Sequence, residues 1–422
     1  MHGGEQGVDL TTELHELTLN QLTYGGEAAG RLRDGRIVLA GFGLPGERVL
    51  VELVGEKSDF VRGRVVEVLE PAPERISPRC RHYGVCGGCQ YQHMTYAAQL
   101  KAKSKILEDQ LFRIGHLDRP PVEPAVGSPR QWNYRNQVQF HLTEAGRLGY
   151  VMSRDLPQQS RQILEIEECH LPESPIAVFW PQLTFDADTD VERVDIRVGS
   201  NEDILLGLVS HSGAITEMDI EAGVSVAHVS GSDVVVLAGN GHVMMRVKDR
   251  LFRVSPTSFF QVNAAVAEMM VEHVLSRLPA RPGTVLDIYC GVGLFSAFLA
   301  ERSDRVIGIE ASPAACEDFA YNLDEFDNVE LYEDAAERVL PALNVQPETA
   351  IVDPPRAGLR RAALDALARM APSQVIYVSC DPSTLARDAG LLSAQGYKLV
   401  QATPFDLFPQ TFHIESISVF SQ

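Results

Sequence analysis

The chain has 422 residues, of which 45% are hydrophobic and 22% are charged, so its composition is that of an ordinary globular protein. These proportions exclude a collagen-like, mucin-like or mainly disordered chain. No apolar run reaches the roughly 18 residues of a membrane-spanning helix. The stretch Met1–Gln6 is polar and lacks the apolar centre of a secretory signal. We therefore expect a cytoplasmic protein that has no membrane partner.

The formal net charge is −20, from 37 basic and 57 acidic residues, which by itself argues against a nucleic-acid partner. The charge is unevenly spread, however. Between Pro71 and Arg161 the sequence has 13 Lys and Arg residues against seven Asp and Glu residues. A local basic surface of this kind is compatible with RNA binding.

Residues 10–70 are predicted to form a small β-barrel. Arg48–Val54 and Val61–Val68 are rich in β-branched residues, and Gly-containing turns separate the strands. The size is that of an OB-like module. Pro71–Glu74 is interpreted as a linker.

Four of the seven cysteines, Cys80, Cys86, Cys89 and Cys169, lie apart from the C-terminal ones. Few disulfides are expected in a cytoplasmic chain. Five residues separate Cys80 from Cys86, and two separate Cys86 from Cys89. Four thiolates suit either a [4Fe–4S] cluster or a structural zinc ion, so the spacing predicts a metal site without deciding between the two.

Residues 71–255 are predicted to form a central β-rich domain that also contains one helix. That helix is expected over Tyr96–Phe112, with Leu107 and Leu111 on its apolar side and Lys103 toward solvent. A helical segment near residues 96–115 is expected to pack on the C-terminal domain of residues 256–422. Strands are expected at Gln137–Leu142, Val194–Val198 and Ile204–Val209.

From Pro256 onward, strands alternate with helical segments, which indicates an α/β domain with a doubly wound, mostly parallel sheet over residues 256–422. The expected strands are Thr284–Ile288, Arg305–Ile309, Ala350–Val352 and Val375–Ser379.

A glycine-rich turn follows the first of these strands, at Cys290-Gly291-Val292-Gly293. Glu310 ends the next strand 19 residues after Gly291, where an acid can accept hydrogen bonds from ribose hydroxyls. Dinucleotide binding is the alternative. S-adenosylmethionine is favoured because Asp287 precedes the glycines and Ser296 stands where a dinucleotide motif has its third glycine.

Three further motifs place reactive groups at strand ends. Asp353-Pro354-Pro355-Arg356 resembles the motif of amino-methylating enzymes, except that Arg356 stands where those enzymes have an aromatic residue. Cys380 ends a strand just before an expected helix, whose dipole would favour a thiolate nucleophile. His413 and Glu415 lie on one face at the start of the last strand, where burial among apolar residues would raise the pKa of Glu415 and make it a base.

A thiol, a base and a methyl donor together fit one reaction. Carbon 5 of uracil is a poor nucleophile until a thiolate adds to carbon 6, and a base must then remove the carbon-5 proton so that the thiol can leave. A cytosine-5 enzyme is disfavoured because the chain has no Pro-Cys dipeptide.

The chain resembles the RNA uracil-5-methyltransferase family over residues 256–422. The resemblance implies a Rossmann-like class I methyltransferase domain in which Cys380 is the nucleophile and Glu415 the base. Asp381 stands where the family often has Asn, and its charge is expected to disfavour the thiolate. The matching segments are Asp287–Phe295, Asp353–Arg356, Tyr377–Asp388 and Phe408–Glu415. The positions implied to bind S-adenosylmethionine are Gln261, Tyr289, Glu310, Asp334 and Asp353.

The N-terminal parts are similar to those of the ribosomal RNA members of this family. The barrel resembles a TRAM domain, and the four early cysteines resemble the ligands of an iron–sulfur cluster. The resemblance therefore implies a monomeric enzyme that methylates a uridine of 23S ribosomal RNA, in a single-stranded or flipped-out state. The alternatives are methylation of uridine 54 in transfer RNA, an RNA-binding protein with an inactive methyltransferase fold, and a nicotinamide-dependent oxidoreductase.

Overall fold

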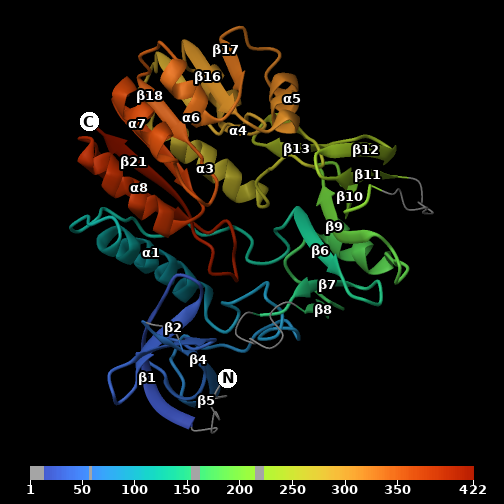
Figure 1. Cartoon of the computed structure of the whole chain (residues 1–422), viewed down its shortest axis with the longest axis vertical. Coiled ribbons are helices and arrows are strands. Elements are labelled where there is room, and N and C mark those ends of the chain that lie inside the picture. Colours follow the sequence, from blue (N-terminus) through green and yellow to red (C-terminus); the bar gives the residue numbers. More distant parts are fainter. Residues whose placement is uncertain (1–13, 57–58, 154–161, 214–222) are drawn as a thin grey trace, which may run out of the picture. The chain divides into compact units, whose positions relative to one another are not determined.

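In the computed structural model, five strands near the N-terminus close into a barrel in the order β1-β2-β3-β5-β4 (Figure 1). Leu19, Val38 and Val51 fill it and are fully buried. The predicted small β-barrel is thus confirmed. The strands are β1 (Leu14–Leu22), β2 (Glu27–Arg31), β3 (Ile37–Gly41), β4 (Arg48–Glu56) and β5 (Val61–Glu70).

The structure describes residues 14–56, 59–153, 162–213 and 223–422. Parts of the predicted barrel domain, residues 10–13 and 57–58, lie outside these ranges. The described residues fall into two units. The first lies within Met1–Gln99, Met152–Gln162 and Gln410–Phe412, and the second within Leu100–Val151, Ile163–Pro409 and His413–Gln422. The division into domains 10–70, 71–255 and 256–422 stays a prediction.

Helix α1 (Tyr96–Arg113) nearly coincides with the predicted helix. Its residues Leu107 and Leu111 are fully buried and belong to the same apolar core as Leu364 and Leu385. One part of the prediction is wrong: Lys103 does not face solvent but is fully buried. Positions 103, 107 and 111 are four residues apart and therefore share a helix face, which places Lys103 on the packed side.

The central part of the second unit is a seven-stranded sheet in the order β12-β11-β10-β9-β6-β7-β8. Its neighbouring strands are antiparallel except for the parallel pair β10 and β11. A separate hairpin, β13 with β14, follows it. The elements are β6 (Gln137–Leu142), β7 (Leu148–Val151), β8 (Ile163–Glu165), α2 (Ser174–Phe179), η1 (Trp180–Gln182), β9 (Val191–Val198), β10 (Ile204–Ser210), β11 (Val224–Ser230), β12 (Asp233–Ala238), β13 (Val243–Val247) and β14 (Arg250–Val254).

The C-terminal part is a seven-stranded sheet in the order β17-β16-β15-β18-β19-β21-β20. β21 is antiparallel to both of its neighbours, β19 and β20, and the other neighbouring strands are parallel to each other. This doubly wound architecture confirms the predicted α/β class. The elements are α3 (Ala264–Arg277), β15 (Thr284–Ile288), α4 (Leu294–Ala300), β16 (Arg305–Glu310), α5 (Pro313–Asn322), β17 (Val329–Glu333), α6 (Ala336–Val339), η2 (Leu340–Ala342), β18 (Thr349–Val352), α7 (Arg361–Met370), β19 (Gln374–Ser379), α8 (Pro382–Ala394), β20 (Lys398–Phe405) and β21 (Glu415–Ser421).

Helices cover both faces of this sheet (Figure 1). One apolar core joins the sheet to α3, α4 and α5, and a second joins it to α1, α6, α7 and α8. The strands between them are apolar on both sides, as expected for a sheet buried between two helical layers. Among the described residues, no helix has the length and apolar character needed to cross a membrane.

Candidate active site

The carboxyl ends of five neighbouring parallel strands meet at one edge of the C-terminal sheet, and each is followed or ended by a predicted site residue. From β15 the sheet grows in both directions, toward β16 on one side and toward β18 on the other. A doubly wound fold binds its ligands at the carboxyl ends of the strands beside such a switch point. The antiparallel strand β21 begins at the same edge with Glu415. In sheet order, the residues are Asp334 after β17, Glu310 at the end of β16, Tyr289 after β15, Asp353 after β18 and Cys380 after β19.

The glycine-rich turn after β15 is held by Glu310. One carboxylate oxygen of Glu310 accepts a hydrogen bond from the backbone N–H of Gly291 at 2.9 Å, and the other accepts from Ala311 and Ser312. Tyr289 has a positive φ of 65° and Gly291 one of 54°, so the backbone turns sharply here. The acid that was predicted to contact ribose therefore also fixes the turn that would face the nucleoside.

The turn has features that fit a bound adenosylmethionine. A Cβ at Gly291 would meet no atom within 4 Å, so there is open space against the backbone. Asp287 is fully buried; its Oδ2 accepts from Ser296 at 2.6 Å, while its Oδ1 has no hydrogen-bond partner among the described residues. Buried polar atoms usually have a hydrogen-bond partner. An N–H or O–H group of a bound ligand would supply one for Asp287 Oδ1.

Asp353 lies between β15 and β19, and its backbone N–H donates to the carbonyl of Ile288 at 3.1 Å. Burial raises its pKa to about 7, with further contributions from the carboxylates of Asp287 and Glu310. Burial also raises the pKa of Asp287 to about 6. Three carboxyl groups are thus gathered where a cationic sulfonium donor would lower the cost of ionising them.

The two remaining predicted donor-binding residues are placed differently. Asp334 is half-buried, and its carboxylate accepts from the N–H of Ala335 and pairs with Arg338, which lowers its pKa. Gln261 is buried in the segment before α3, and its carbonyl accepts from Asn136 Nδ2 at 3.0 Å. Their contact with a donor stays a prediction.

Cys380 and Glu415 come together through the antiparallel pairing of β19 and β21. The register pairs Ser379 with Ser416, so one further step brings Cys380 opposite Glu415. Cys380 is half-buried and Glu415 is 3% exposed. The pairing of the two strands therefore brings the candidate nucleophile and the candidate base to the same point of the sheet.

Cys380 stands in a largely anionic environment. Burial raises the pKa of its thiol to about 12, and the carboxyl groups of Glu415, Asp353 and Asp381 add to the effect, while the Arg356 guanidinium opposes it. The expected activation by the dipole of α8 stays a prediction. Asp381 instead caps α8, accepting from the N–H groups of Ser383 and Thr384 at 2.9 and 3.0 Å. Asn caps a helix equally well, so an Asp at this position preserves the start of the helix.

Glu415 has its pKa raised well above the ordinary value by burial and by the charge of Asp353, and Arg356 again acts in the opposite direction. Arg356 itself is exposed, and its Nη2 donates to His413 Nδ1 at 3.3 Å. Arg356 thus lowers the pKa values of both the candidate nucleophile and the candidate base. His413 lies two residues before Glu415 in the sequence and contacts Arg356.

The loop that carries Asp353 and Arg356 is tied to α8 by Asp388, which sequence reasoning did not single out. Asp388 is fully buried, and its Oδ2 accepts from the N–H of Leu359 and the hydroxyl of Tyr377, both at 2.7 Å. Arg387 pairs with Asp388 and donates to the carbonyl of Ala357. A charged residue on the apolar side of a helix was the available signal.

A second buried acid, Asp318 of α5, ties down the segment before Gln261. It accepts from Arg253 Nε at 2.7 Å, from the N–H and hydroxyl of Ser255 at 2.8 Å each, and from the hydroxyl of Ser258 at 2.7 Å. It was also missed, because its partners lie 60 or more residues away in the sequence.

The four predicted metal ligands are divided between the two units, with Cys80, Cys86 and Cys89 in the first and Cys169 in the second. The thiol of Cys86 accepts a hydrogen bond from the N–H of Gly88 at 3.4 Å. Within the ranges that the structure describes, no group of three or more His, Cys, Asp or Glu side chains is arranged to hold a metal ion. The metal site stays a prediction.

Comparison with known proteins decides the family. A family model described as tRNA (Uracil-5-)-methyltransferase matches residues 223–422. An uncharacterised RNA methyltransferase of Halalkalibacterium halodurans is 32% identical over 96% of this chain and 96% of its own length. One from Aquifex aeolicus is 33% identical, over 96% of this chain and 97% of its own length. The chain belongs to the RNA (uracil-5-)-methyltransferase family.

This methyltransferase is therefore an enzyme that depends on S-adenosylmethionine and acts on RNA. A solved structure, the tRNA (uracil-54, C5)-methyltransferase of Pyrococcus abyssi in complex with S-adenosyl-L-homocysteine, is 25% identical to it with a TM-score of 0.73. The match covers 96% of this chain and 99% of the other, and confirms the class I methyltransferase fold. The oxidoreductase alternative is excluded by this membership.

Proposed function

We propose that this methyltransferase adds a methyl group to carbon 5 of a uridine in 23S ribosomal RNA, through a covalent bond between Cys380 Sγ and carbon 6 of the base. The observation that carries the proposal is the edge of the C-terminal sheet, where Asp353, Cys380 and Glu415 stand at the ends of three neighbouring strands. The strand that begins with Glu415 pairs in register with the strand that precedes Cys380.

Cys380 loses its proton to solvent, with the thiolate stabilised by Arg356, and its sulfur bonds to carbon 6, which leaves a nucleophilic enolate at carbon 5. The bound donor supplies an electrophilic methyl group and leaves as S-adenosylhomocysteine. Glu415 then takes the carbon-5 proton, the double bond re-forms, and Cys380 departs as a thiolate.

Donor binding is assigned to Gln261, Tyr289, Glu310, Asp334 and Asp353. Glu310 supports this because its carboxylate lies against the glycine-rich turn. Asp287, which was not among the predicted contacts, joins the donor site in this proposal because its Oδ1 is buried without a partner among the described residues. The charges of Asp287 and Glu310 act on Asp353, and the charge of Asp353 acts on Cys380, so Asp353 links the donor region to the proposed nucleophile.

The first unit is assigned to RNA recognition. We propose that its barrel is a TRAM-like RNA-binding module and that Cys80, Cys86, Cys89 and Cys169 hold a [4Fe–4S] cluster. The support is the spacing of the cysteines and their resemblance to the ribosomal RNA members. The cluster is given a structural role and no step in methyl transfer.

Uridine 54 of transfer RNA is the second candidate substrate. It is favoured by the Pyrococcus abyssi enzyme, whose title names that nucleotide and whose fold matches nearly the whole chain. The extent of the match therefore does not distinguish a ribosomal RNA substrate from a transfer RNA substrate. The preference for ribosomal RNA rests on the resemblance of the N-terminal parts.

The test is transfer of a labelled methyl group from S-adenosylmethionine to unmodified transcripts of 23S ribosomal RNA and of transfer RNA, each offered alone and in competition. We expect 5-methyluridine in the ribosomal transcript, identified by nucleoside mass spectrometry, and none with Cys380→Ala. Preferred labelling of the transfer RNA transcript would replace ribosomal RNA by the second candidate, and a methylated base other than uracil would refute the proposal.

A further inference from the structure

We propose that Lys103 of α1, together with Tyr134 and Asn263, positions the candidate base Glu415 by fixing the irregular segment Asp406–Pro409 that leads to it. This inference rests on the proposed role of Glu415. Lys103 does not touch the reacting atoms, and its effect on the reaction passes through the backbone of that segment.

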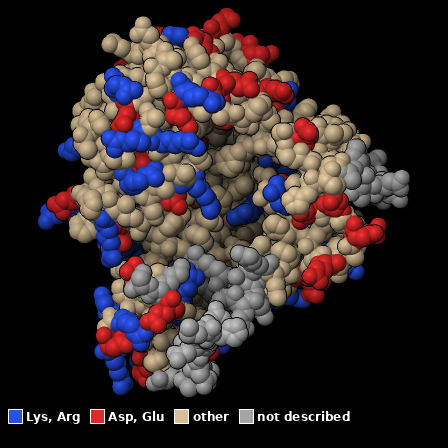
Figure 2. Space-filling view, in the orientation of Figure 1, with Lys and Arg blue, Asp and Glu red and all other residues tan. Residues whose placement is uncertain are grey.

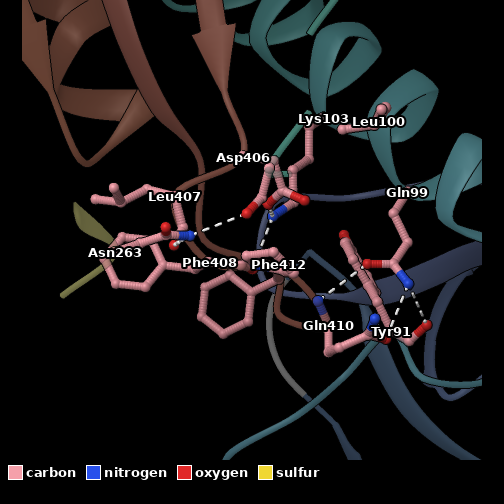
Figure 3. Close-up of polar contacts among 12 residues, drawn as sticks. Tyr91, Gln99, Leu100, Lys103, Asn263, Asp406, Leu407, Phe408, Gln410 and Phe412 are labelled. Atoms are coloured by element: carbon pink, nitrogen blue, oxygen red, sulfur yellow. Dashed lines mark hydrogen bonds and ion pairs between the residues drawn. The ribbon is translucent and has the colours of Figure 1, made fainter. Parts of the chain in front are cut away.

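Lys103 and Asp406 form an ion pair that is shielded from water. The Nζ atom of Lys103 lies 2.6 Å from Asp406 Oδ1, and the two side chains are 1% and 0% exposed (Figure 3). Asp406 Oδ2 has no hydrogen-bond partner among the described residues, so its carboxylate depends on Lys103. Removing one partner of such a pair leaves the other as an unpaired buried charge, which is strongly destabilising. The pair therefore holds the segment more rigidly than an exposed ion pair would.

Three consecutive carbonyl groups after Asp406 accept hydrogen bonds from buried side chains. The carbonyl of Leu407 accepts from Asn263 Nδ2 at 3.3 Å, that of Phe408 from Lys103 Nζ at 3.1 Å, and that of Pro409 from the Tyr134 hydroxyl at 3.0 Å. Lys103, Tyr134 and Asn263 are all fully buried. The N–H of Asp406 donates to the carbonyl of Val126 at 2.9 Å.

These contacts replace regular secondary structure. The segment lies between the end of β20 at Phe405 and the start of β21 at Glu415, so no strand or helix sets its path. Buried backbone groups outside regular structure need side-chain partners, and here each carbonyl has a different one. Three donors from distant parts of the sequence thus define one conformation. Figure 3 shows two of them, Lys103 and Asn263.

Asn263 also connects this segment to the proposed donor site. Its Oδ1 caps α3 by accepting from the N–H of Val266, and its Nδ2 also donates to Ser128 Oγ at 3.1 Å. It stands two residues after Gln261. One side chain therefore fixes both the start of the helix behind the donor-binding segment and the approach to the base.

Positioning matters most for the step in which Glu415 removes the carbon-5 proton. A general base must lie within hydrogen-bond reach of its proton, and a misplacement of about 1 Å slows a reaction by roughly 100-fold. If the segment is loosened, methyl transfer should continue while elimination slows. The enzyme should then accumulate on RNA as a methylated covalent adduct.

The experiment compares full-length Lys103→Met with Leu111→Ala on unmodified RNA transcripts and S-adenosylmethionine. Leu111 is a matched control because it is fully buried on the same helix and belongs to an apolar core that does not include residues 406–409. We expect Lys103→Met to slow elimination at least tenfold and to accumulate denaturant-stable adduct, with adenosylmethionine affinity within about twofold of wild type. Leu111→Ala should lose thermal stability without accumulating adduct.

Two further variants keep the test decisive. Tyr134→Phe removes only the hydroxyl that donates to Pro409 and should fold normally, with elimination slowed severalfold. Lys103→Met with Asp406→Leu removes the stranded charge and should regain thermal stability but not the elimination rate. Regaining both, or a wild-type elimination rate in Tyr134→Phe and Lys103→Met, would overturn the positioning role.

Glu415→Gln, run in parallel, separates this inference from the proposed function. If Glu415→Gln accumulates adduct and the positioning variants do not, only the present inference fails. If Glu415→Gln itself releases methylated RNA at the wild-type rate, the assignment of the base fails first.

Discussion

At the scale of single residues, the candidate active site at the edge of the C-terminal sheet combines one cation with several anions. Arg356 is the group that opposes the effect of burial and of neighbouring carboxylates on both Cys380 and Glu415. With a pKa of about 12, the Cys380 thiol is protonated at neutral pH. Its thiolate fraction should therefore rise about tenfold for each unit of pH across the neutral range.

Replacing Arg356 should make this thiol less reactive. We expect Arg356→Gln to lower the rate of Cys380 alkylation by iodoacetamide by roughly tenfold at every pH from 7 to 9, which corresponds to about one pKa unit. The rate is followed by mass spectrometry of the peptide that contains Cys380. Arg361→Gln is the control, since Arg361 is exposed and pairs only with Asp365 in the contacts resolved here. Equal rates in wild type and Arg356→Gln would contradict the role of Arg356.

Asp353 should make donor binding depend on pH. Its pKa is raised to about 7 in the free protein, and a cationic donor favours the ionised carboxylate. Affinity for adenosylmethionine should therefore strengthen roughly tenfold from pH 6 to pH 8, with release of a proton on binding at pH 6. Calorimetry in two buffers of different ionisation enthalpy measures that proton. Asp353→Asn should bind more weakly and lose the dependence, whereas Asp334→Asn should keep it; a pH-independent wild type would refute the assignment.

At the scale of elements, α5 holds the segment of residues 255–258, which precedes Gln261, through hydrogen bonds. Asp318 receives four hydrogen bonds from Arg253, Ser255 and Ser258. Arg197, also buried, donates to the carbonyls of Ser255 and Ser258. The segment has no regular structure, so its path depends on these two side chains.

Asp318→Asn should weaken the hydrogen bonds that hold this segment to α5. We expect the KM for adenosylmethionine to rise roughly tenfold while kcat falls by less, because the change alters donor binding more than the reacting groups. The melting temperature should also fall, since the guanidinium of Arg253 loses a buried counter-charge. Asp365→Asn on the surface of α7 is the control. A wild-type KM would mean that α5 supports the fold but not the donor site.

The sequence predicts regular elements well where their periodicity is strong. The strands Gln137–Leu142 and Thr284–Ile288 have the predicted bounds, and α1 ends one residue beyond its prediction. The candidate site could be predicted because strand ends deliver its residues. Lys103 was misplaced because lysine is usually exposed, and only its distant partner Asp406 explains its burial. Asp318 was missed for the same reason, because its partners are brought close only by the tertiary fold. Asp388 is adjacent to its partner Arg387, but its contacts with Leu359 and Tyr377 form only in the tertiary fold.

At the scale of the whole molecule, the net charge of −20 must be reconciled with an RNA substrate. On the face shown in Figure 2, Lys and Arg side chains are interspersed with Asp and Glu rather than excluded. In the second unit, two exposed arginines lie beside the candidate active site. Arg356 is in the loop after β18, and Arg387 of α8 donates to the carbonyl of Ala357 in that loop. Local cations of this kind can contact phosphates although the whole chain is acidic.

The proposed cluster makes a prediction for the intact protein. Anaerobically purified enzyme should be brown and contain about four irons and four sulfides per chain. Cys86→Ser should lose much of this iron, whereas Cys316→Ser, a buried cysteine of the C-terminal sheet domain, should not. Metal and sulfide analysis decides the matter, and a colourless protein that carries zinc would show that the four thiols hold a different metal.

The most direct test of the covalent mechanism uses RNA transcripts that contain 5-fluorouridine, incubated with the enzyme and S-adenosylmethionine. Fluorine cannot leave as a proton, so Glu415 cannot complete the reaction and the enzyme should remain bonded to the RNA through Cys380. We predict a denaturant-stable, methylated adduct with wild type and none with Cys380→Ala, and sequencing of the trapped RNA locates the uridine. Wild-type enzyme that methylates ordinary transcripts but forms no adduct with fluorinated ones would contradict covalent catalysis by Cys380.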